Sequence, residues 1–412
     1  MSEELDALAD PSARAAQMNA SGYFADVPDF SLVLGGPVYQ LFRRAHLSGD
    51  ALELLYRRVV AVVLITWVPL LILALIPAAT GGTVFVAFLQ DLEAQARFLI
   101  ALPLLIVAEL TVHQRSRTVV RRFLDRRLIR PQDLDRFIAG VNWALRMRNS
   151  IAIELGLIAV VWTLGHWLWS HYFALETTGW FGTLGTASGH LTPAGYWYAY
   201  VSIPVFQFIL VRWYLRFFIW YGFLFRVSRL TLHLTATHPD RAGGLAFLGK
   251  SAYAFGPILF AQGTLLAGLI ATRVLYEGAN LLDFKMEAAG LIVFFVLIVL
   301  GPLTMFTPQL AYTKRRGLGA YGMLASHYVQ GFEEKWIVQN TAEREEILGT
   351  GDIQSLADLG NSYAVVADMK LVPFGLTDIT RLAAATAAPL LPLGLTVLSF
   401  EDLVVRIFKI VF

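Results

Sequence analysis

Long apolar runs, each separated from the next by a more polar stretch, dominate the chain from residue 59 onwards. A helix needs about 20 predominantly apolar residues to cross the hydrocarbon core of a bilayer, because it rises only about 1.5 Å per residue. Lipid offers no hydrogen-bond partners to the backbone, so such runs must be helical. The pattern predicts an all-α membrane protein, a polytopic helical bundle of about seven transmembrane helices, at residues 59–77, 98–112, 151–169, 198–225, 252–275, 289–313 and 382–398.

The more polar stretches carry a second pattern, in which apolar residues recur at helical spacing between charges. This spacing is typical of amphipathic helices. It divides the chain into an N-terminal cytoplasmic segment with an amphipathic helix, a membrane domain of six spans, a cytoplasmic helical segment, and a last span followed by an interfacial C-terminal helix. The corresponding residues are 1–58, 59–313, 314–377 and 378–412, and a basic cytoplasmic segment at 113–149 interrupts the membrane domain.

The connections between the predicted spans differ sharply in arginine content. Residues 113–149 contain ten arginines, whereas 78–96 and 171–197 contain neither lysine nor arginine. Because Lys and Arg accumulate in cytoplasmic loops, this asymmetry predicts a cytoplasmic N-terminus. The chain opens with acidic residues rather than a basic stretch and an apolar core, so we expect no cleavable signal peptide. These observations predict a multi-pass protein of a bacterial inner membrane.

Composition changes this picture little but excludes several chemistries. Hydrophobic residues make up 56% of the 412 residues, the mean hydropathy is +0.58, and the formal net charge is only +2. No basic tract stands apart from the apolar runs, so the lipid bilayer and not nucleic acid is the expected partner. The absence of cysteine excludes disulfides, thiolate metal sites and cysteine-held iron–sulfur clusters in this chain.

Two motifs match patterns found in known sites, but we do not interpret either as a site. Residues 244–251 satisfy the phosphate-loop expression G-x-x-x-x-G-K-[ST], but that loop needs a soluble α/β context, whereas here a membrane span follows. His233 and His238 with Asp240 offer metal-ligand chemistry, although two loop histidines beside an interface are more often solvated. Metalloprotease and hydrolase patterns are missing. We therefore expect no catalytic residue, no cofactor and no metal.

Ionisable residues inside the apolar runs are the strongest candidates for function. Each costs several kcal/mol to bury in lipid, so such residues usually face a partner or a hydrophilic pathway. Counting back from the flanking arginines puts Glu109 and Glu154 roughly 9 Å inside the cytoplasmic boundary. Arg212 and Arg216 lie one helical turn apart on one face of their span. The sequence thus predicts two carboxylates opposite two guanidinium groups in the cytoplasmic half of the membrane.

Two interpretations of these charges remain open. They form either a buried ion-pair network that joins helices or the lining of an anion pathway, with Gln262 and Gln309 as further polar walls. Each glutamine taken alone fits an interhelical hydrogen bond better than a pathway wall. The leading hypothesis is a channel or secondary transporter for a small ion or anionic solute. The alternative is a non-transporting scaffold or signalling module that docks a cytoplasmic partner or anionic lipid. Small residues at 383–388 allow close helix contact within the monomer or in a homo-oligomer.

Two stretches carry a resemblance to other proteins. They are Thr-His-Pro-Asp-Arg-Ala-Gly-Gly-Leu at 237–245 and a segment that begins with Asp-Leu-Gly-Asn-Ser-Tyr at 358–363 and extends to Pro-Leu-Leu-Pro-Leu at 389–393. In these stretches the chain resembles a group of bacterial multi-pass inner-membrane proteins with no assigned function. The resemblance implies a bacterial inner-membrane location and nothing about activity.

Overall fold

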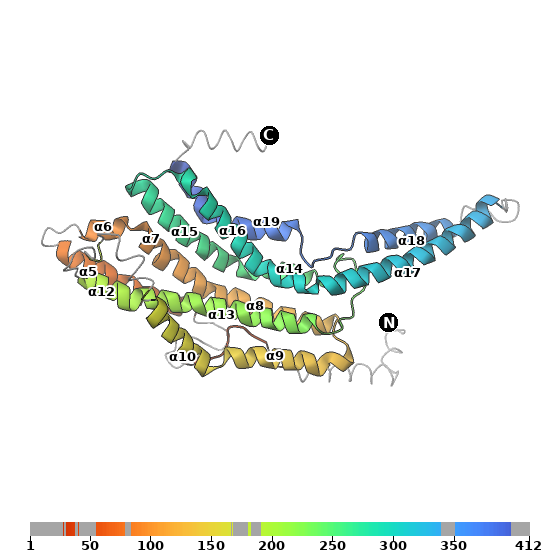
Figure 1. Ribbon diagram of the computed structural model, residues 1–412, viewed down its shortest axis with the longest axis horizontal. Coiled ribbons are helices and arrows are strands. Elements are labelled where there is room, and N and C mark those ends of the chain that lie inside the picture. Colours follow the sequence, from red (N-terminus) through yellow and green to blue (C-terminus); the bar gives the residue numbers. More distant parts are fainter. Residues whose placement is uncertain are drawn as a thin grey trace, which may run out of the picture.

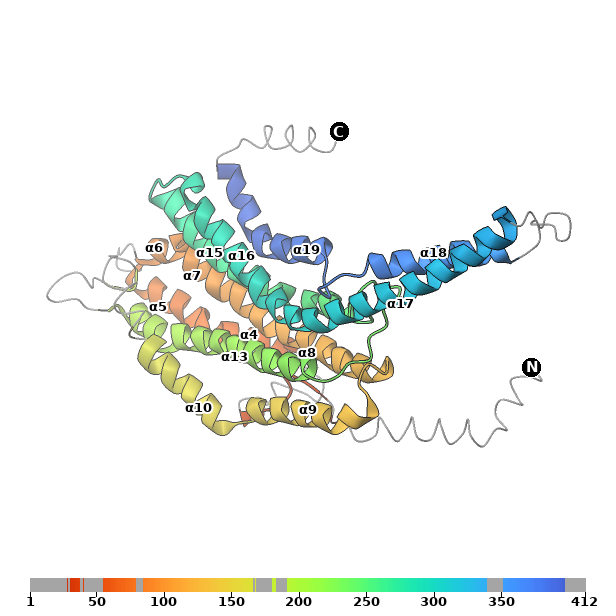
Figure 2. The same cartoon turned by 45° about the vertical axis from the view of Figure 1, so that its right-hand side comes forward.

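Every regular element in the part of the chain that the structure describes is a helix. The computed structural model describes residues 28, 30–37, 40, 55–78, 84–165, 167, 180–182, 191–338 and 351–396. Within these ranges the sheet-like contacts amount to an isolated antiparallel bridge between Gly182 and Leu191. The helices run side by side as one bundle, and a helical hairpin projects from it (Figures 1 and 2).

Many helices in the bundle are joined end to end, with short π-helical or 3-10 turns between α-helices. The first half contains α4 (Leu55–Thr66), α5 (Val68–Ala78), α6 (Val84–Gln90), α7 (Leu92–Gln95), η1 (Ala96–Ala101), α8 (Leu102–Asp125), η2 (Pro131–Asp133), α9 (Leu134–Arg148), α10 (Ile151–Val160), η3 (Val161–Gly165), α12 (Pro193–Trp197), η5 (Tyr198–Ser202) and α13 (Ile203–Ser228). The second half contains α14 (Phe247–Ser251), η6 (Ala252–Phe255), α15 (Gly256–Tyr276), η7 (Leu281–Phe284), α16 (Lys285–Leu300), η8 (Gly301–Phe306), α17 (Thr307–Glu333), η9 (Glu334–Val338), α18 (Asp352–Ala367), α19 (Leu376–Ala387) and η11 (Ala388–Thr396).

Five continuous helical stretches are long and apolar enough to cross a bilayer, and a sixth forms if two bent helices count as one span. The five stretches are Leu55–Pro77, Leu92–Asp125, Pro193–Ser228, Phe247–Tyr276 and Leu281–Val338. The sixth is the pair Pro131–Arg148 and Ile151–Gly165, which is bent by 47°. The protein is therefore polytopic, with five or six candidate spans among the described residues rather than the seven predicted.

The predicted seventh span is the source of this difference. Residues 376–396 form α19 and then a 3-10 helix, η11, which contains Pro389 and Pro392 instead of continuing as an α-helix. The segment nevertheless follows α15 in parallel along much of its length. Contacts join Tyr253 to Asp378 and Gly263 to Thr386, and Leu393 belongs to one apolar cluster with Ile270. Residues 397–412, which include the predicted interfacial C-terminal helix, lie outside the described part of the chain.

Prolines in the spans lie where the helix changes type. Pro103 stands in the first turn of α8 directly after the π-helical turn η1, and Pro204 does the same in α13 after η5. The first turn of a helix has backbone N–H groups without an intrahelical acceptor, so proline removes the least there. The preceding wide turns thus let these long helices accommodate proline inside an apolar run.

At one end of the bundle, which we call the basic end, α8 passes into α9 through an arginine-rich turn and α17 leaves the body. There α17 and α18 form an antiparallel hairpin, the arm, which comprises residues 317–338 and 351–367 (Figures 1 and 2). The Tyr328 hydroxyl donates to the Asp352 carbonyl at 3.0 Å, and Gly317 lies against Val366. The segment at residues 314–377, which the sequence predicts to be helical, thus contains the arm, a two-helix extension of the membrane helices.

Most of the predicted N-terminal segment, including residues 41–54 of its amphipathic helix, lies outside the described residues. The short stretch Phe30–Gly36 is described, and Phe30, Leu32 and Val33 in it are buried in the bundle. Phe30 packs on Phe223 of α13 with 5.1 Å between ring centroids. This stretch is therefore part of the core at the basic end rather than a free extension.

Candidate functional site

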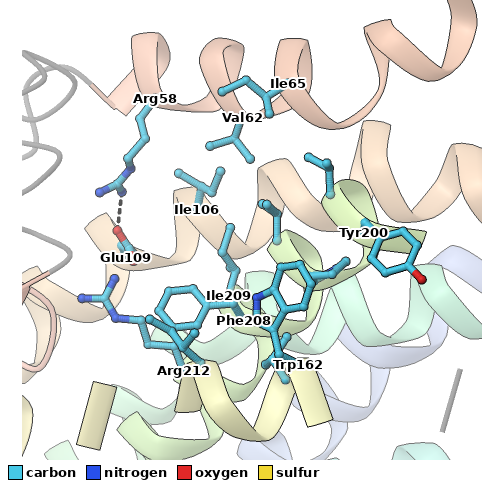
Figure 3. Close-up of a pocket in the computed structure, with 15 residues that line it drawn as sticks. Arg58, Val62, Ile65, Ile106, Glu109, Trp162, Tyr200, Phe208, Ile209 and Arg212 are labelled. Atoms are coloured by element: carbon cyan, nitrogen blue, oxygen red, sulfur yellow. Dashed lines mark hydrogen bonds and ion pairs between the residues drawn. The ribbon is translucent and has the colours of Figure 1, made fainter. Parts of the chain in front are cut away.

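Glu109 of α8 is shared by two arginines from different helices. Arg216 of α13 donates from Nη2 to Glu109 Oε1 at 2.6 Å. Arg58 of α4 donates to Oε2 (Figure 3). All three residues are buried, with exposed fractions of 7% or less. A carboxylate that accepts from two guanidinium groups satisfies both oxygens, which is the condition for tolerating buried charge. This arrangement joins α4, α8 and α13 inside the bundle.

Arg212 and Glu154 form a second pair next to the first. Arg212 Nη2 lies 3.3 Å from Glu154 Oε1, and the Glu154 side chain is 6% exposed. Arg216, one turn further along α13, also lies over the Trp213 ring with its guanidinium carbon 4.4 Å from the ring centroid. The two pairs together, which we call the ion cluster, contain the side chains of Arg58, Glu109, Glu154, Arg212 and Arg216. Counted over these five described side chains, the ion cluster contains three guanidinium groups and two carboxylates.

The buried N-terminal stretch covers the ion cluster from the basic end. A Cβ atom on Gly36 would lie 3.0 Å from Glu154 Oε1, so the backbone passes directly over that carboxylate. Gly36 has a φ of +88°, a conformation that glycine adopts without strain. Arg148 donates to the Ser31 carbonyl at 2.5 Å, and the Ser31 hydroxyl lies 2.8 Å from His113 Nδ1. The cluster is thus closed on the side where the N-terminal stretch enters.

On its other side the ion cluster borders a pocket of about 450 Å³ between α4, α8, α10, η3 and α13, which we call the apolar pocket (Figure 3). Arg58, Glu109 and Arg212 lie at one end of it, and Trp162 and Tyr200 lie toward the other. The remaining lining residues are Val62, Ile65, Ile106, Ile158, Val161, Val201, Pro204, Val205, Phe208 and Ile209. The pocket is therefore a hydrocarbon-lined space with charged groups at a single end.

Side chains around the pocket indicate where it opens. Ile65, Trp162 and Tyr200 line it and are 51%, 50% and 43% exposed. These residues belong to stretches that qualify as candidate spans or to the bent pair. The apolar pocket therefore opens on the side of the bundle rather than at either end of it.

The structure brings four of the six sequence-predicted site residues together, namely Glu109, Glu154, Arg212 and Arg216. Gln262 lies elsewhere: it is buried in α15 beside Tyr214 of α13 and does not line the apolar pocket. Its Nε2 has no hydrogen bond of acceptable geometry within the described part of the chain. Gln262 is therefore not part of the wall of the apolar pocket.

Gln309 also lies away from the ion cluster, at the start of α17. Its Nε2 donates to the carbonyls of Ser228 and Leu230 at 2.6 and 2.8 Å, and its Oε1 accepts from Leu232 N at 3.3 Å. These bonds hold the chain in the extended conformation in which it leaves α13. Gln309 thus joins a helix to a connecting segment and does not line the apolar pocket.

Sequence reasoning missed Arg58, which belongs to the ion cluster. Arg57 and Arg58 immediately precede the first apolar run, where basic residues normally mark the cytoplasmic flank of a span. In the structure Arg58 of α4 is buried while the neighbouring Arg57 is exposed. The missing information was which of the two arginines faces the bundle.

A second polar group lies at the opposite end of the bundle and was also missed. Arg97 pairs with Glu93 one turn away and donates to the Tyr198 hydroxyl at 2.5 Å. Asp91 caps α7 by accepting from Ala94 N and also accepts from the Trp180 indole at 2.8 Å. These groups satisfy one another and line no described pocket, so we interpret them as structural.

The loop at residues 237–245, the first of the two stretches that carry the resemblance, is held by the side chain of one of its own residues, Asp240. Asp240 accepts hydrogen bonds from Ala242 N, Gly244 N and Ala246 N at 2.9 to 3.1 Å. This leaves the residues of the phosphate-loop expression in a turn followed by helices, without the preceding strand that the motif requires. Among the described residues, no group of three or more His, Cys, Asp or Glu side chains is arranged to hold a metal.

In comparisons with known proteins, no family model matches the chain, and neither a curated protein nor a solved structure matches it. The resemblance to bacterial inner-membrane proteins is therefore not supported by an identified family or homologue. What the fold establishes is a helical protein with five or six candidate membrane spans.

Proposed function

We propose that this protein is a membrane carrier that takes up an amphiphilic anion from the bilayer, with the apolar tail in the apolar pocket and the anionic headgroup at the ion cluster. The observation that carries the proposal is the pocket itself, which has an apolar wall and guanidinium groups at one end. Its volume of about 450 Å³ lies within the range of about 300–1,000 Å³ that is usual for small-molecule sites.

The wall of the pocket argues against the simpler reading of a channel for a hydrated ion. Selective ion pathways replace the water around an ion with carbonyl oxygens or rings of charged side chains. Here ten or more of the fifteen lining residues are aliphatic or aromatic. A hydrocarbon chain has no hydration shell to lose along most of its length. It therefore suits this wall better than a small ion does.

The headgroup end favours an anion for an electrostatic reason. Three guanidinium groups and two carboxylates make up the described side chains of the ion cluster, in a buried setting where charge is poorly screened by solvent. A second anion would add to the carboxylates that these guanidinium groups already contact. A guanidinium group binds a carboxylate or a phosphate through paired hydrogen bonds. Arg58 and Arg212 both line the pocket and are the groups that would reach the headgroup.

Exchanging the two charges of one pair tests the proposal without removing the pair. Arg212 lines the pocket whereas its partner Glu154 does not, so Arg212→Glu combined with Glu154→Arg keeps an ion pair but turns a carboxylate toward the pocket. In detergent, native mass spectrometry with palmitate should detect binding to the wild type and about a tenfold loss in the exchanged variant. Hexadecanol, which has the same chain without the charge, should bind both proteins weakly and equally.

Filling the pocket provides an independent test with a matched control. Ile65→Trp should reduce palmitate binding because Ile65 lines the pocket, whereas Ile72→Trp on the same span should not, because Ile72 faces outward and does not line it. The proposed site would be ruled out by equal binding of palmitate and hexadecanol, or if neither the exchange of Arg212 and Glu154 nor Ile65→Trp changed palmitate binding. Transport is measured separately, as the rate at which lysophosphatidate crosses from the inner leaflet of proteoliposomes to external albumin.

The orientation of the carrier follows from the same arginines that define the basic end. We infer that the basic end faces the cytoplasm of a bacterium, since Lys and Arg accumulate on that side of the inner membrane. The chain lacks cysteine, so a single cysteine in place of Gly331 on the arm reports sidedness directly. A membrane-impermeant maleimide should label it only after the membrane is opened, and labelling of intact spheroplasts would reverse the orientation.

A second candidate function, a membrane scaffold, is favoured by the arm. The arm projects beyond the bundle (Figures 1 and 2) and exposes Met323, Leu324 and Ile337 to solvent. Exposed apolar side chains on a projecting hairpin are suited to docking a partner protein. Under this reading Met323→Lys with Leu324→Lys would dissociate a native complex on blue native gels, whereas the Arg212 and Glu154 exchange would leave it intact.

A further inference from the structure

A second hollow in the protein, of about 660 Å³, lies at the basic end outside the apolar pocket. One wall is the first part of α17, and the other is the connecting segment from Leu230 to Thr237, which leaves the end of α13. Arg130, from the turn between α8 and α9, completes it. We call this hollow the basic cleft.

The connecting segment is held as an extended strip by contacts on its inner side. Thr231 N donates to Asp133, Leu232 N to Gln309, and His233 N to the Leu128 carbonyl. Side chains in an extended chain alternate between two faces, and here Leu230 and Leu232 are buried while Thr231, His233 and Thr235 are exposed. The basic cleft therefore has a wall that is fixed before any ligand binds.

The charges in the basic cleft are all of one sign. Arg130 and Arg316 line it, and no Asp or Glu is among its lining residues. Neither arginine has an ion pair with a carboxylate in the ranges that the structure covers. The lining also includes the hydroxyls of Thr231, Thr235, Thr313 and Tyr312. Such a set of donors with no competing acceptor charge is suited to a multiply charged anion.

We propose that the basic cleft binds a phosphate monoester, with Arg130 and Arg316 as its charge partners and the threonine hydroxyls as further donors. A guanidinium group matches phosphate geometry through paired hydrogen bonds, and a phosphate monoester offers several acceptor oxygens. The location at the end of the bundle allows two sources for this chemistry: the headgroup of an anionic lipid and a soluble phosphate ester. The inference does not depend on the ligand of the apolar pocket.

The experiment separates the two sources by using the same headgroup with and without lipid chains. The full-length protein is placed in phosphatidylcholine nanodiscs, either with phosphatidic acid added to the lipid or with soluble glycerol 3-phosphate added to the buffer. The shift in unfolding temperature gives an apparent Kd for each. A shift with phosphatidic acid alone assigns the cleft to a lipid headgroup, and a shift with glycerol 3-phosphate assigns it to a soluble ester. No shift in either arm overturns the proposal.

Neighbouring arginines on α17 provide the matched control. Arg316→Gln should weaken binding about tenfold, since it removes one charge-assisted contact, and Arg130→Gln should do the same. Arg315→Gln changes the net charge equally but does not line the cleft, so it should leave the Kd within about twofold. All three side chains are exposed, so these variants should fold normally. Equal losses from Arg315→Gln and Arg316→Gln would mean that only the general basic surface attracts the phosphate, and the cleft would be rejected.

Discussion

The bundle and the arm use the same kind of charge pair in opposite settings. In the bundle, Glu109 accepts from Arg58 and Arg216 while all three are almost fully buried. In the arm, Asp352 accepts from Lys335 at 2.9 Å and from the Trp336 indole at 3.0 Å. The Asp352 side chain is 35% exposed and that of Lys335 is 41% exposed. Coulomb attraction and the cost of desolvation both grow as solvent is excluded. The buried pairs of Glu109 therefore join α4, α8 and α13, whereas the partly exposed pair of Asp352 holds only two segments together.

The difference extends from charges to packing. Gly263 of α15 lies so close to the backbone of Thr386 that an added Cβ would be 2.0 Å from that carbonyl oxygen. An added Cβ on Gly360 of α18 would meet no atom within 4 Å outside the neighbouring turns of its own helix. Close backbone approach through small residues is how helices pack in lipid, where apolar side chains gain little by leaving their surroundings. Gly263 of the bundle therefore needs the absence of a side chain, whereas Gly360 of the arm does not.

The largest expected effect comes from breaking the ion cluster at its shared carboxylate. Glu109→Gln keeps the shape of the side chain but leaves Arg58 and Arg216 without a countercharge in a buried position. Removing one partner of a buried ion pair costs about 3–5 kcal/mol. Unfolding of the protein in mixed detergent micelles should show this loss, and Glu287→Gln, an exposed position on α16, should show almost none. A loss below about 1 kcal/mol would mean that water reaches the cluster and screens its charges.

The ion cluster also shows which site residues could be predicted from the sequence and which could not. Glu109, Glu154, Arg212 and Arg216 stand out because each interrupts an apolar run, and a count of helical rise predicted equal depths for the two glutamates. Arg58 does not stand out, because a basic residue at the edge of a run has a sufficient explanation in membrane orientation. Which arginine pairs with which carboxylate depends on the rotation of each helix about its axis, and hydropathy does not contain that information.

The fold was predictable to a similar degree. Five of the predicted apolar runs lie in continuous helices that qualify as candidate spans, because length and hydropathy alone determine that outcome. The third run bends away from α9 by 47°, and the last becomes a 3-10 helix around its prolines. Both departures depend on neighbours, such as the fit of α19 against Gly263, rather than on the composition of the run. The apolar pocket could not be foreseen for the same reason.

The same substitution at two glycines should have opposite signs in the two regions. Gly263→Ala forces α19 away from α15 because its new Cβ meets a backbone oxygen, and overpacking of this kind costs about 1–3 kcal/mol. Gly360→Ala meets nothing and lies in α18, where alanine favours the helix over glycine by about 0.5–1 kcal/mol. Thermal unfolding followed by circular dichroism gives the first value, and amide exchange along α18 gives the second. Destabilisation by both substitutions would remove the proposed contrast in packing.

The smallest effect concerns the contact between Asp352 and the end of α17, and it depends on pH. Hydrogen bonds from Lys335 and Trp336 lower the pKa of the Asp352 carboxyl below its ordinary value of about 3.8. Because the pKa is lower in the folded arm than in an open one, the carboxylate stabilises the arm at neutral pH, and this contribution is lost as the pH falls below about 4. Acid should therefore loosen the arm while leaving the bundle intact.

Spin labels can follow this loosening, since the chain has no cysteine of its own. Labels at Ser326→Cys and Ser355→Cys, both exposed, report the distance between α17 and α18 by double electron–electron resonance. The distance distribution should be narrow at pH 7 and broaden below about pH 4, and Asp352→Asn should broaden it already at pH 7. Asp358 provides the control, because it accepts from Gln354 on its own helix at 2.9 Å, so Asp358→Asn should leave the distribution narrow at neutral pH. If the distribution stayed narrow in acid and in Asp352→Asn, packing of Gly317 against Val366 rather than charge would hold the arm closed.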